Sequence, residues 1–297
     1  MSLMGVNSEY GRLCAVLLHR PGPEIAGYPD PAGILHLRPV DYAALMREYD
    51  TVIDAFELSG IAVTLIDPPS TGADQWCRYN MMYCRDLFFM TPHGAIMAHM
   101  ANTIRGEEPL YAARTLHALG IPLVHTVSGT GRFEGADALW LRDDLVLVGV
   151  GNRTNRQGYR QLRDVLEQQG VQCVSLPSSQ MITQHLLGSV QIVDRDLALV
   201  RHEIIAPAII RFLEGEGFTV ISIPENREVR CQQAMNIVTI APRIVVMTAG
   251  CPETKGLYLE AGLTIAAELD LTQLINGAGG LACATGIVAR TGKTDRQ

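Results

Sequence analysis

A run of small residues directly before a cysteine is the part of this sequence most open to a chemical role. Residues 277–282 read Gly-Ala-Gly-Gly-Leu-Ala, and Cys283 follows them. A cysteine thiolate is a strong nucleophile in electropositive or partly exposed surroundings, and glycines allow the backbone to approach another group closely. The run begins no βαβ unit, so it is not a dinucleotide-binding loop. The alternative is a small cysteine buried in a strand.

A nucleophilic cysteine needs a partner that can move protons, and His185 is our candidate. It follows a turn-rich segment and lies directly before an apolar stretch that is typical of a strand. An imidazole can act as general acid and then as general base. The chain has 8 histidines, and an ordinary structural histidine is the alternative at this position.

Two carboxylates precede equivalent predicted strands. Asp86 ends the segment 80–86, and Glu134 lies in Arg-Phe-Glu-Gly-Ala-Asp at 132–137. If both face one pocket, they suit a buried cation, because an unpaired buried charge is costly. A planar guanidinium pairs with carboxylates in a bidentate manner. The alternative is that both are solvated acids in turns.

Five junctions between a helical stretch and a strand must position these residues. Each helical stretch ends in a glycine that is followed by a short apolar strand, and the spacing between these glycines is 45 to 60 residues. The glycines are Gly60, Gly120, Gly170, Gly217 and Gly262. Glycine after a helix indicates a left-handed residue that ends it. A persistent period of this length predicts a repeat architecture.

Two apolar strands joined by a turn precede four of the helices, as expected for hairpins. The predicted pairs are 83–90 with 95–100, 138–141 with 145–150, 188–193 with 197–200, and 237–240 with 244–247. The first module has one early strand, 13–19, and we expect 284–290 to pair with it and close a ring. The strand after each helix is apolar nearly throughout, so we expect both its faces to be covered.

The prediction is an α/β protein of five ββαβ modules that form one closed, propeller-like domain over residues 1–297. An ordinary α/β sandwich is the alternative. The chain has 31 acidic and 24 basic residues, a net charge of −7, which argues against nucleic-acid binding. Its 7 cysteines are scattered without a CxxC pair, so we expect neither a disulfide scaffold nor a metal site.

No apolar stretch is long enough for a membrane helix, and the first residues lack the pattern of a signal peptide. We therefore expect a cytoplasmic protein that binds no membrane. A homo-oligomer stays open, because no patch in the sequence indicates one.

Taken together, these motifs resemble the guanidine-modifying enzymes of the pentein fold. This superfamily contains arginine deiminases, dimethylarginine dimethylaminohydrolases, arginine dihydrolases and amidinotransferases. The segment 80–86 is similar to the family's Asn-x-x-Phe-x-Arg-Asp, and 134–137 is similar to its Glu-Gly-Gly-Asp. His185 and Cys283 match the family histidine and the terminal nucleophile, and residues 6–22 resemble an arginine deiminase start. The resemblance implies a five-bladed, pseudo-symmetric α/β propeller.

The resemblance also implies a role for each of seven residues. Cys283 would attack the guanidino carbon, and His185 would protonate the departing amine and then activate water. Glu134 and Asp86 would hold the guanidinium nitrogens. The substrate-binding residues would be Asn80, together with Arg105 and Arg153, which would reach a substrate carboxylate. No cofactor is implied, and the partner is a small guanidino compound.

Three features depart from the deiminase pattern. Leu187 occupies a position where deiminases and amidinotransferases have Asp, and Ala278 one where deiminases have Arg. Residues 67–80 are too few for the helical subdomain that deiminases insert there. We therefore expect a hydrolase of arginine or a substituted arginine, of the dimethylarginine hydrolase, deiminase or dihydrolase type. The alternatives are an amidinotransferase and a non-catalytic pentein that only binds its ligand.

Overall fold

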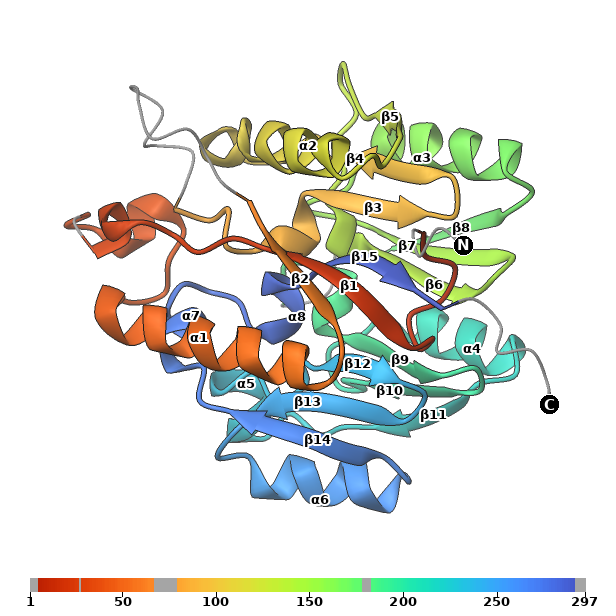
Figure 1. The fold of residues 1–297 in the computed structure, drawn as a ribbon. Coiled ribbons are helices and arrows are strands. Elements are labelled where there is room, and N and C mark those ends of the chain that lie inside the picture. Colours follow the sequence, from red (N-terminus) through yellow and green to blue (C-terminus); the bar gives the residue numbers. More distant parts are fainter. Residues whose placement is uncertain (1–4, 27, 67–78, 178–182, 292–297) are drawn as a thin grey trace.

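A computed structural model of the chain describes residues 5–26, 28–66, 79–177 and 183–291. Most of the segment 67–80, from which we inferred a missing subdomain, lies outside the described residues. The described part contains five sheets of three strands each, arranged as a ring of blades (Figure 1). In four blades a hairpin is followed by a helix and a strand that returns parallel to the second hairpin strand. The five-bladed ββαβ prediction is therefore confirmed.

Four blades are continuous in sequence. The second is β3 (Phe88–Thr91), β4 (Gly94–Met97), α2 (Glu108–Ala118) and β5 (Leu123–Thr126). The third is β6 (Ala138–Arg142), β7 (Leu145–Val150), α3 (Arg156–Gln168) and β8 (Gln172–Pro177). The fourth is β9 (Val190–Asp194), β10 (Leu197–Val200), α4 (Pro207–Gly215) and β11 (Thr219–Ser222). The fifth is β12 (Val238–Ala241), β13 (Ile244–Thr248), α6 (Pro252–Glu260) and β14 (Thr264–Leu269).

The first blade joins the two ends of the described chain. It contains β1 (Leu13–Leu18), α1 (Tyr42–Leu58) and β2 (Ala62–Leu65). Its remaining strand is β15 (Gly286–Arg290), which pairs antiparallel with β1. The predicted closure of the ring by the last apolar segment is therefore confirmed.

The five helix ends follow one pattern. Gly60, Gly120, Gly170, Gly217 and Gly262 have φ angles of 75°, 75°, 76°, 87° and 80°. An L-residue with a side chain is strained in this left-handed region, and glycine is not. Each glycine therefore ends its helix and directs the chain into the return strand. The helices α1, α2, α3, α4 and α6 lie on the periphery of the ring (Figure 1).

The expectation that the return strands are covered on both faces is wrong. Four of the five, β2, β5, β11 and β14, consist of exposed and half-buried residues with at most one buried position. β8 has one buried residue as well. Each return strand is an outer edge of its sheet, so it lacks a neighbour on one side. Their apolar residues cover the inner face of the adjacent helix, and part of their surface stays in contact with solvent.

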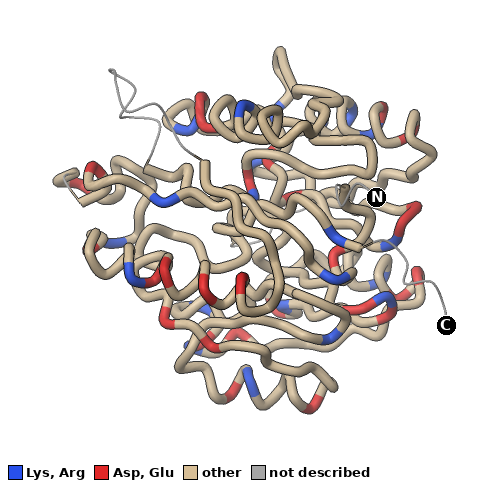
Figure 2. Tube along the Cα trace, viewed as in Figure 1, with Lys and Arg blue, Asp and Glu red and all other residues tan. Residues whose placement is uncertain are grey.

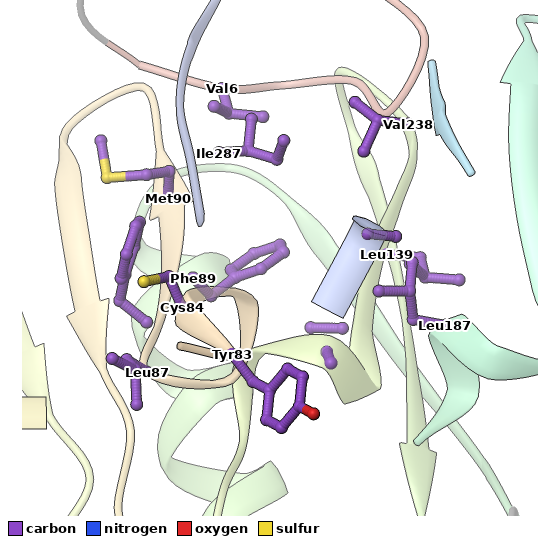
Figure 3. Packing of buried hydrophobic residues seen from close by; sticks show 14 of the residues in the cluster. Val6, Tyr83, Cys84, Leu87, Phe89, Met90, Leu139, Leu187, Val238 and Ile287 are labelled. Carbon is purple, nitrogen blue, oxygen red and sulfur yellow. The ribbon is translucent and has the colours of Figure 1, made fainter. Parts of the chain in front are cut away.

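The first hairpin strands, β3, β6, β9, β12 and β15, lie at the other edge of their sheets and are buried almost throughout. Their side chains meet at the centre of the ring. Figure 3 shows Phe89, Leu139, Val238 and Ile287 packed there together with Leu187. The centre is thus apolar, and short turns before these inner strands are the places where polar groups can enter.

Charged residues are interspersed along the trace rather than gathered at one place (Figure 2). No helix of the described residues is long and apolar enough to cross a membrane.

Candidate active site

A short turn before each inner strand brings one polar side chain towards the same place. Asp86, Glu134, His185, Asn236 and Cys283 lie two to five residues before β3, β6, β9, β12 and β15 respectively. Four of the turns are single helical turns: Cys84–Asp86, Gly135–Asp137, Leu186–Gly188 and α8 (Leu281–Ala284). The repeat therefore delivers one functional group from each blade.

Cys283 is held by Asn236. The Asn236 Nδ2 donates to Cys283 Sγ at 3.0 Å, and Asn236 Oδ1 accepts from the Cys283 amide at 3.1 Å. Burial raises the pKa of the Cys283 thiol, and the Asp86 carboxylate adds to this effect. Hydrogen bonds from the Gly280 amide and from Asn236 lower it, as does the charge of Arg105.

The glycines before Cys283 make room for side chains of the protein itself. A Cβ on Gly279 would lie 2.3 Å from Cε1 of Tyr83, and one on Gly280 would lie 2.7 Å from Cβ of Asn236. The Tyr83 hydroxyl also donates to the Leu274 carbonyl at 2.9 Å, which ties Tyr83 to α7 (Thr272–Asn276), the helix directly before the glycine loop. The close approach predicted from the glycine run is real, and its partners are Tyr83 and Asn236.

His185 lies between two carboxylates. Its Nε2 donates to Glu134 Oε2 at 2.6 Å, and its Nδ1 is 3.7 Å from Asp86 Oδ1. Burial by itself lowers the pKa of His185, but the Asp86, Glu134 and Asp137 carboxylates outweigh it and raise this pKa to about 9. The imidazole is therefore protonated at neutral pH, which is the form that can donate a proton.

Glu134 does not face the pocket in the way that the resemblance implied. Its side chain is fully buried. Oε1 accepts from the Ala101 amide at 2.9 Å, and Oε2 accepts from His185. Burial raises its pKa, but the hydrogen bond and charge of His185, with Arg105 and Arg153, lower it to about 2. Each oxygen accepts one hydrogen bond inside the protein, and the geometry favours a role in orienting His185, while contact with a guanidinium stays a prediction.

Arg105 likewise pairs with groups of the protein itself. Its side chain is 4 % exposed, with NH1 2.6 Å from Asp86 Oδ2 and Nε 2.9 Å from Glu108 Oε2. NH2 donates to the Asn80 carbonyl at 3.3 Å. These contacts hold Arg105 against Asp86, and Arg105 also lines the pocket, so its contact with a ligand's carboxylate stays a prediction.

A pocket of about 290 Å³ opens at this place. Six of the seven predicted residues line it: Asn80, Asp86, Arg105, Arg153, His185 and Cys283. Arg153 lies 3.7 Å from Glu134 Oε1 and hydrogen-bonds Gln184. The Asn80 side chain donates to the Ile34 carbonyl at 2.8 Å. Glu134 alone among the seven stands behind the lining.

The two departures from the deiminase pattern lie in the same pocket. Leu187 lines it and also belongs to the apolar centre, where it is 4 % exposed. Ala278 lines it with a φ of 84°, in the left-handed region where an alanine is strained. The wall therefore carries apolar carbon at both positions.

Asp86, Glu134 and His185 each offer a ligand atom, and these atoms lie within 4.8 Å of one another. Carboxylate and imidazole donors in this arrangement are a ligand set for a divalent metal. However, the Arg105 guanidinium is 2.6 Å from Asp86 and 3.9 Å from Glu134. Its charge already pairs with these carboxylates and would repel a metal ion, so the group does not fit a metal centre well.

Sequence reasoning missed Asn236 and the supporting acids Glu108 and Asp137. Burial raises the pKa of Glu108 to about 8 against the opposing effect of Arg105, and that of Asp137 to about 6 against that of His185. The position of Asn236 in the repeat could have identified it. Asn236 precedes β12 as the polar residues of the other four blades precede their inner strands. Asp137 ends the 134–137 motif but was given no role there, and Glu108 pairs with Arg105 only three residues earlier, a spacing too common to single it out.

Comparisons with known proteins find similarity to enzymes that act on guanidino groups. The model of the family described as arginine deiminase matches residues 78–213. The N(G),N(G)-dimethylarginine dimethylaminohydrolase of Pseudomonas aeruginosa is 23 % identical over 84 % of this chain and 90 % of its own length. The enzyme of the same name from Streptomyces coelicolor is 24 % identical over 83 % of this chain and 86 % of its own.

Solved structures share the fold. A Pseudomonas aeruginosa dimethylarginine dimethylaminohydrolase variant complexed with citrulline has a TM-score of 0.75 at 20 % identity, over 94 % of this chain and all of its own. The amidinotransferase SxtG from Microseira wollei has a TM-score of 0.76 at 16 % identity, over 99 % of both chains. The chain is thus similar in sequence to dimethylarginine dimethylaminohydrolases, and it shares the five-bladed pentein fold of these solved structures.

Proposed function

We propose that this protein is a hydrolase that attacks the guanidino carbon of arginine or a substituted arginine through a covalent intermediate on Cys283. One observation carries the proposal. Asp86 lines the pocket, and its buried Oδ1 has no hydrogen-bond partner among the described residues. A buried carboxylate oxygen without a donor is costly. A guanidinium N–H supplies both the donor and the positive charge.

The charges around Asp86 support a cationic ligand. Four buried carboxyl groups, Asp86, Glu108, Glu134 and Asp137, surround Arg105 and His185. The raised pKa values of Glu108 and Asp137 show that burial among other carboxylates makes further negative charge unfavourable there. A bound guanidinium relieves this and lowers the pKa of Cys283, whose thiol is otherwise held neutral by burial.

In the proposed steps Cys283 and His185 react, and three further side chains position them or the substrate. On guanidinium binding the Cys283 thiol loses its proton to solvent. The thiolate forms a C–S bond with the guanidino carbon, and one C–N bond breaks as the departing nitrogen takes a proton from His185. The neutral imidazole then accepts a proton from water, whose oxygen attacks the thiouronium carbon as the C–S bond breaks. Glu134 keeps His185 oriented, and Asp86 fixes the guanidinium plane. Arg153 at the pocket wall is left to meet a substrate carboxylate.

A trapping experiment tests the chemistry. We expect 2-chloroacetamidine, a guanidinium analogue, to alkylate Cys283, arginine to slow the labelling, and Cys283→Ala to abolish both labelling and turnover. Peptide mass spectrometry locates the adduct. Turnover that survives Cys283→Ala, with no adduct at this residue in the wild type, refutes the proposal.

Product analysis selects the substrate and the acceptor. Arginine, methylated arginines and agmatine are incubated with the enzyme, with and without added glycine. Citrulline indicates deiminase or dimethylarginine hydrolase chemistry, and ornithine indicates a dihydrolase. Guanidinoacetate formed only with glycine indicates an amidinotransferase, and binding without any product indicates a pentein that only binds its ligand.

A further inference from the structure

We propose that Asn236 is a positioning residue for the nucleophile, which fixes the Cys283 side chain and makes its thiolate easier to form. The inference rests on the proposed function, because it takes Cys283 as the reacting group. Asn236 is 5 % exposed and lines the same pocket as Cys283.

The two hydrogen bonds determine how the Asn236 amide is oriented. The Cys283 backbone N–H is only a donor, so the group facing it at 3.1 Å must be the oxygen, Oδ1. The Nδ2 group consequently faces Sγ at 3.0 Å. An N–H donor aimed at sulfur stabilises the thiolate more than the thiol, since hydrogen bonds to charged groups are the stronger ones.

The surrounding backbone is built to keep Asn236 in this place. Gln233 adopts a φ of 55°, and the backbone N–H of Asn236 donates to the Gln233 carbonyl at 2.8 Å. A tight turn therefore presents the Asn236 side chain. On the other side, Gly280 has no Cβ, and a Cβ there would lie 2.7 Å from Asn236 Cβ. Two segments 47 residues apart in sequence are thus shaped around one amide.

The position of Asn236 in the repeat gives independent support. It precedes β12 as Asp86, Glu134, His185 and Cys283 precede their own inner strands. Four of the five blades supply the nucleophile, the proton-transfer group and the two carboxylates beside it. The fifth supplies a neutral donor, which stabilises a thiolate without adding charge to the guanidinium site.

The test measures the pH dependence of Cys283 alkylation by iodoacetamide, which needs no substrate. We compare wild type with Asn236→Ala and with the nearly isosteric Asn236→Asp. Loss of one hydrogen bond to a charged group shifts a pKa by about one to two units. We therefore expect the alkylation midpoint to rise by about one unit in Asn236→Ala, and further in Asn236→Asp, because its carboxylate repels the thiolate.

Gln157→Glu is the matched control, because it makes the same amide-to-acid change on an exposed part of α3. It should alkylate like wild type. Gly280→Ala leaves Asn236 present but displaces it, and should raise the midpoint as Asn236→Ala does. Circular dichroism and thermal melting confirm that each variant is folded.

The two possible failures are distinguishable. Equal midpoints in wild type, Asn236→Ala and Asn236→Asp overturn the positioning role alone. Absence of any Cys283 alkylation in the wild type overturns the proposed nucleophile and this inference with it. A purely structural Asn236 would change the melting temperature and leave the midpoint unchanged, which also overturns the inference.

Discussion

At the scale of single residues, the site depends on which groups carry protons. His185 is protonated because three buried carboxylates outweigh the effect of its own burial. Cys283 is neutral because burial dominates its surroundings. In the proposed mechanism, arrival of a cation favours the Cys283 thiolate and leaves protonated His185 as a proton donor beside the leaving group.

Removing the charge of Glu134 should lower the pKa of His185. Glu134→Gln keeps the size of the side chain and loses the charge that contacts Nε2 at 2.6 Å. We expect the His185 pKa to fall from about 9 by about one to two units, and the alkaline limb of the kcat profile to move to lower pH with it. NMR titration of the His185 ring measures the change. Glu57→Gln, on the exposed face of α1, is the control, and an unchanged His185 pKa would contradict this account.

Binding a guanidinium should release protons. The added positive charge lowers the pKa values of neighbouring Asp137, about 6, and Glu108, about 8. Titration calorimetry of Cys283→Ala with arginine at pH 7, in buffers of different ionisation enthalpy, should therefore show net proton release. Proton uptake on binding would show that the ligand does not enter as a cation beside these acids.

The site residues were predictable where their chemistry is distinctive. Cys283 after its glycines, and His185 before a strand, are recognisable from type and position. Asn236 is not, because an amide before a strand is common, and only the register of the repeat marks it. Arg105 and Glu134 were assigned to ligand contact because the sequence does not show that Glu108 and Ala101 already occupy their polar atoms.

At the scale of elements, the loop from α7 to α8 is fitted around Tyr83. Gly279→Ala places a Cβ 2.3 Å from the Tyr83 ring, so the loop that carries Cys283 must move. We expect alkylation of Cys283 and turnover to fall by at least tenfold, with partial rescue in the double variant with Tyr83→Ala. Full activity in the single variant would show that the loop tolerates the displacement.

Two glycines should respond in opposite directions to the same change. Gly120 has a φ of 75° at the end of α2, so Gly120→Ala should cost about 1 kcal/mol of unfolding free energy. Gly256 lies within α6 with open space around its Cβ position, so Gly256→Ala should add about 0.5–1 kcal/mol. Urea unfolding measures both, and neither change should alter Cys283 alkylation. A stabilising Gly120→Ala would refute the helix-ending role.

The sequence pattern predicted the five modules of the fold, but it did not predict the burial of their return strands. The five glycine junctions predicted the modules, because a left-handed residue has few alternatives to glycine. The burial of the return strands was predicted wrongly, since an apolar run looks the same in a central strand and at a sheet edge. Which edge faces the centre is decided by how five sheets close on one another.

At the scale of the whole molecule, the buried ionisable groups set how stability responds to pH. His185, Asp137 and Glu108 all have folded-state pKa values raised above their ordinary ones. Stability from such groups is present below the unfolded pKa and lost as pH rises through the folded pKa. We expect the unfolding free energy to decline by several kcal/mol between about pH 5 and pH 9. A protein that grows steadily more stable over this range would contradict the assignments.

The single-domain organisation over residues 1–297 stays a prediction, and an unfolding experiment on the protein tests this prediction. Pairing of β15 with β1 joins the last blade to the first, so local opening should disrupt the ring as a whole. We expect one thermal transition, in which secondary structure and the alkylation of Cys283 that depends on Asn236 are lost together. Two separated transitions would show independent units.

The delivery of one side chain per blade has a consequence for protein engineering. Each turn before an inner strand is anchored in its own sheet, so a residue there can be exchanged without rebuilding the other four. Leu187 lies in the turn before β9 and Ala278 in the loop before α8, and both line the pocket wall. A small combinatorial library at these two positions, with the five polar side chains left unchanged, is therefore a compact means of redirecting the proposed nucleophile towards other amidines.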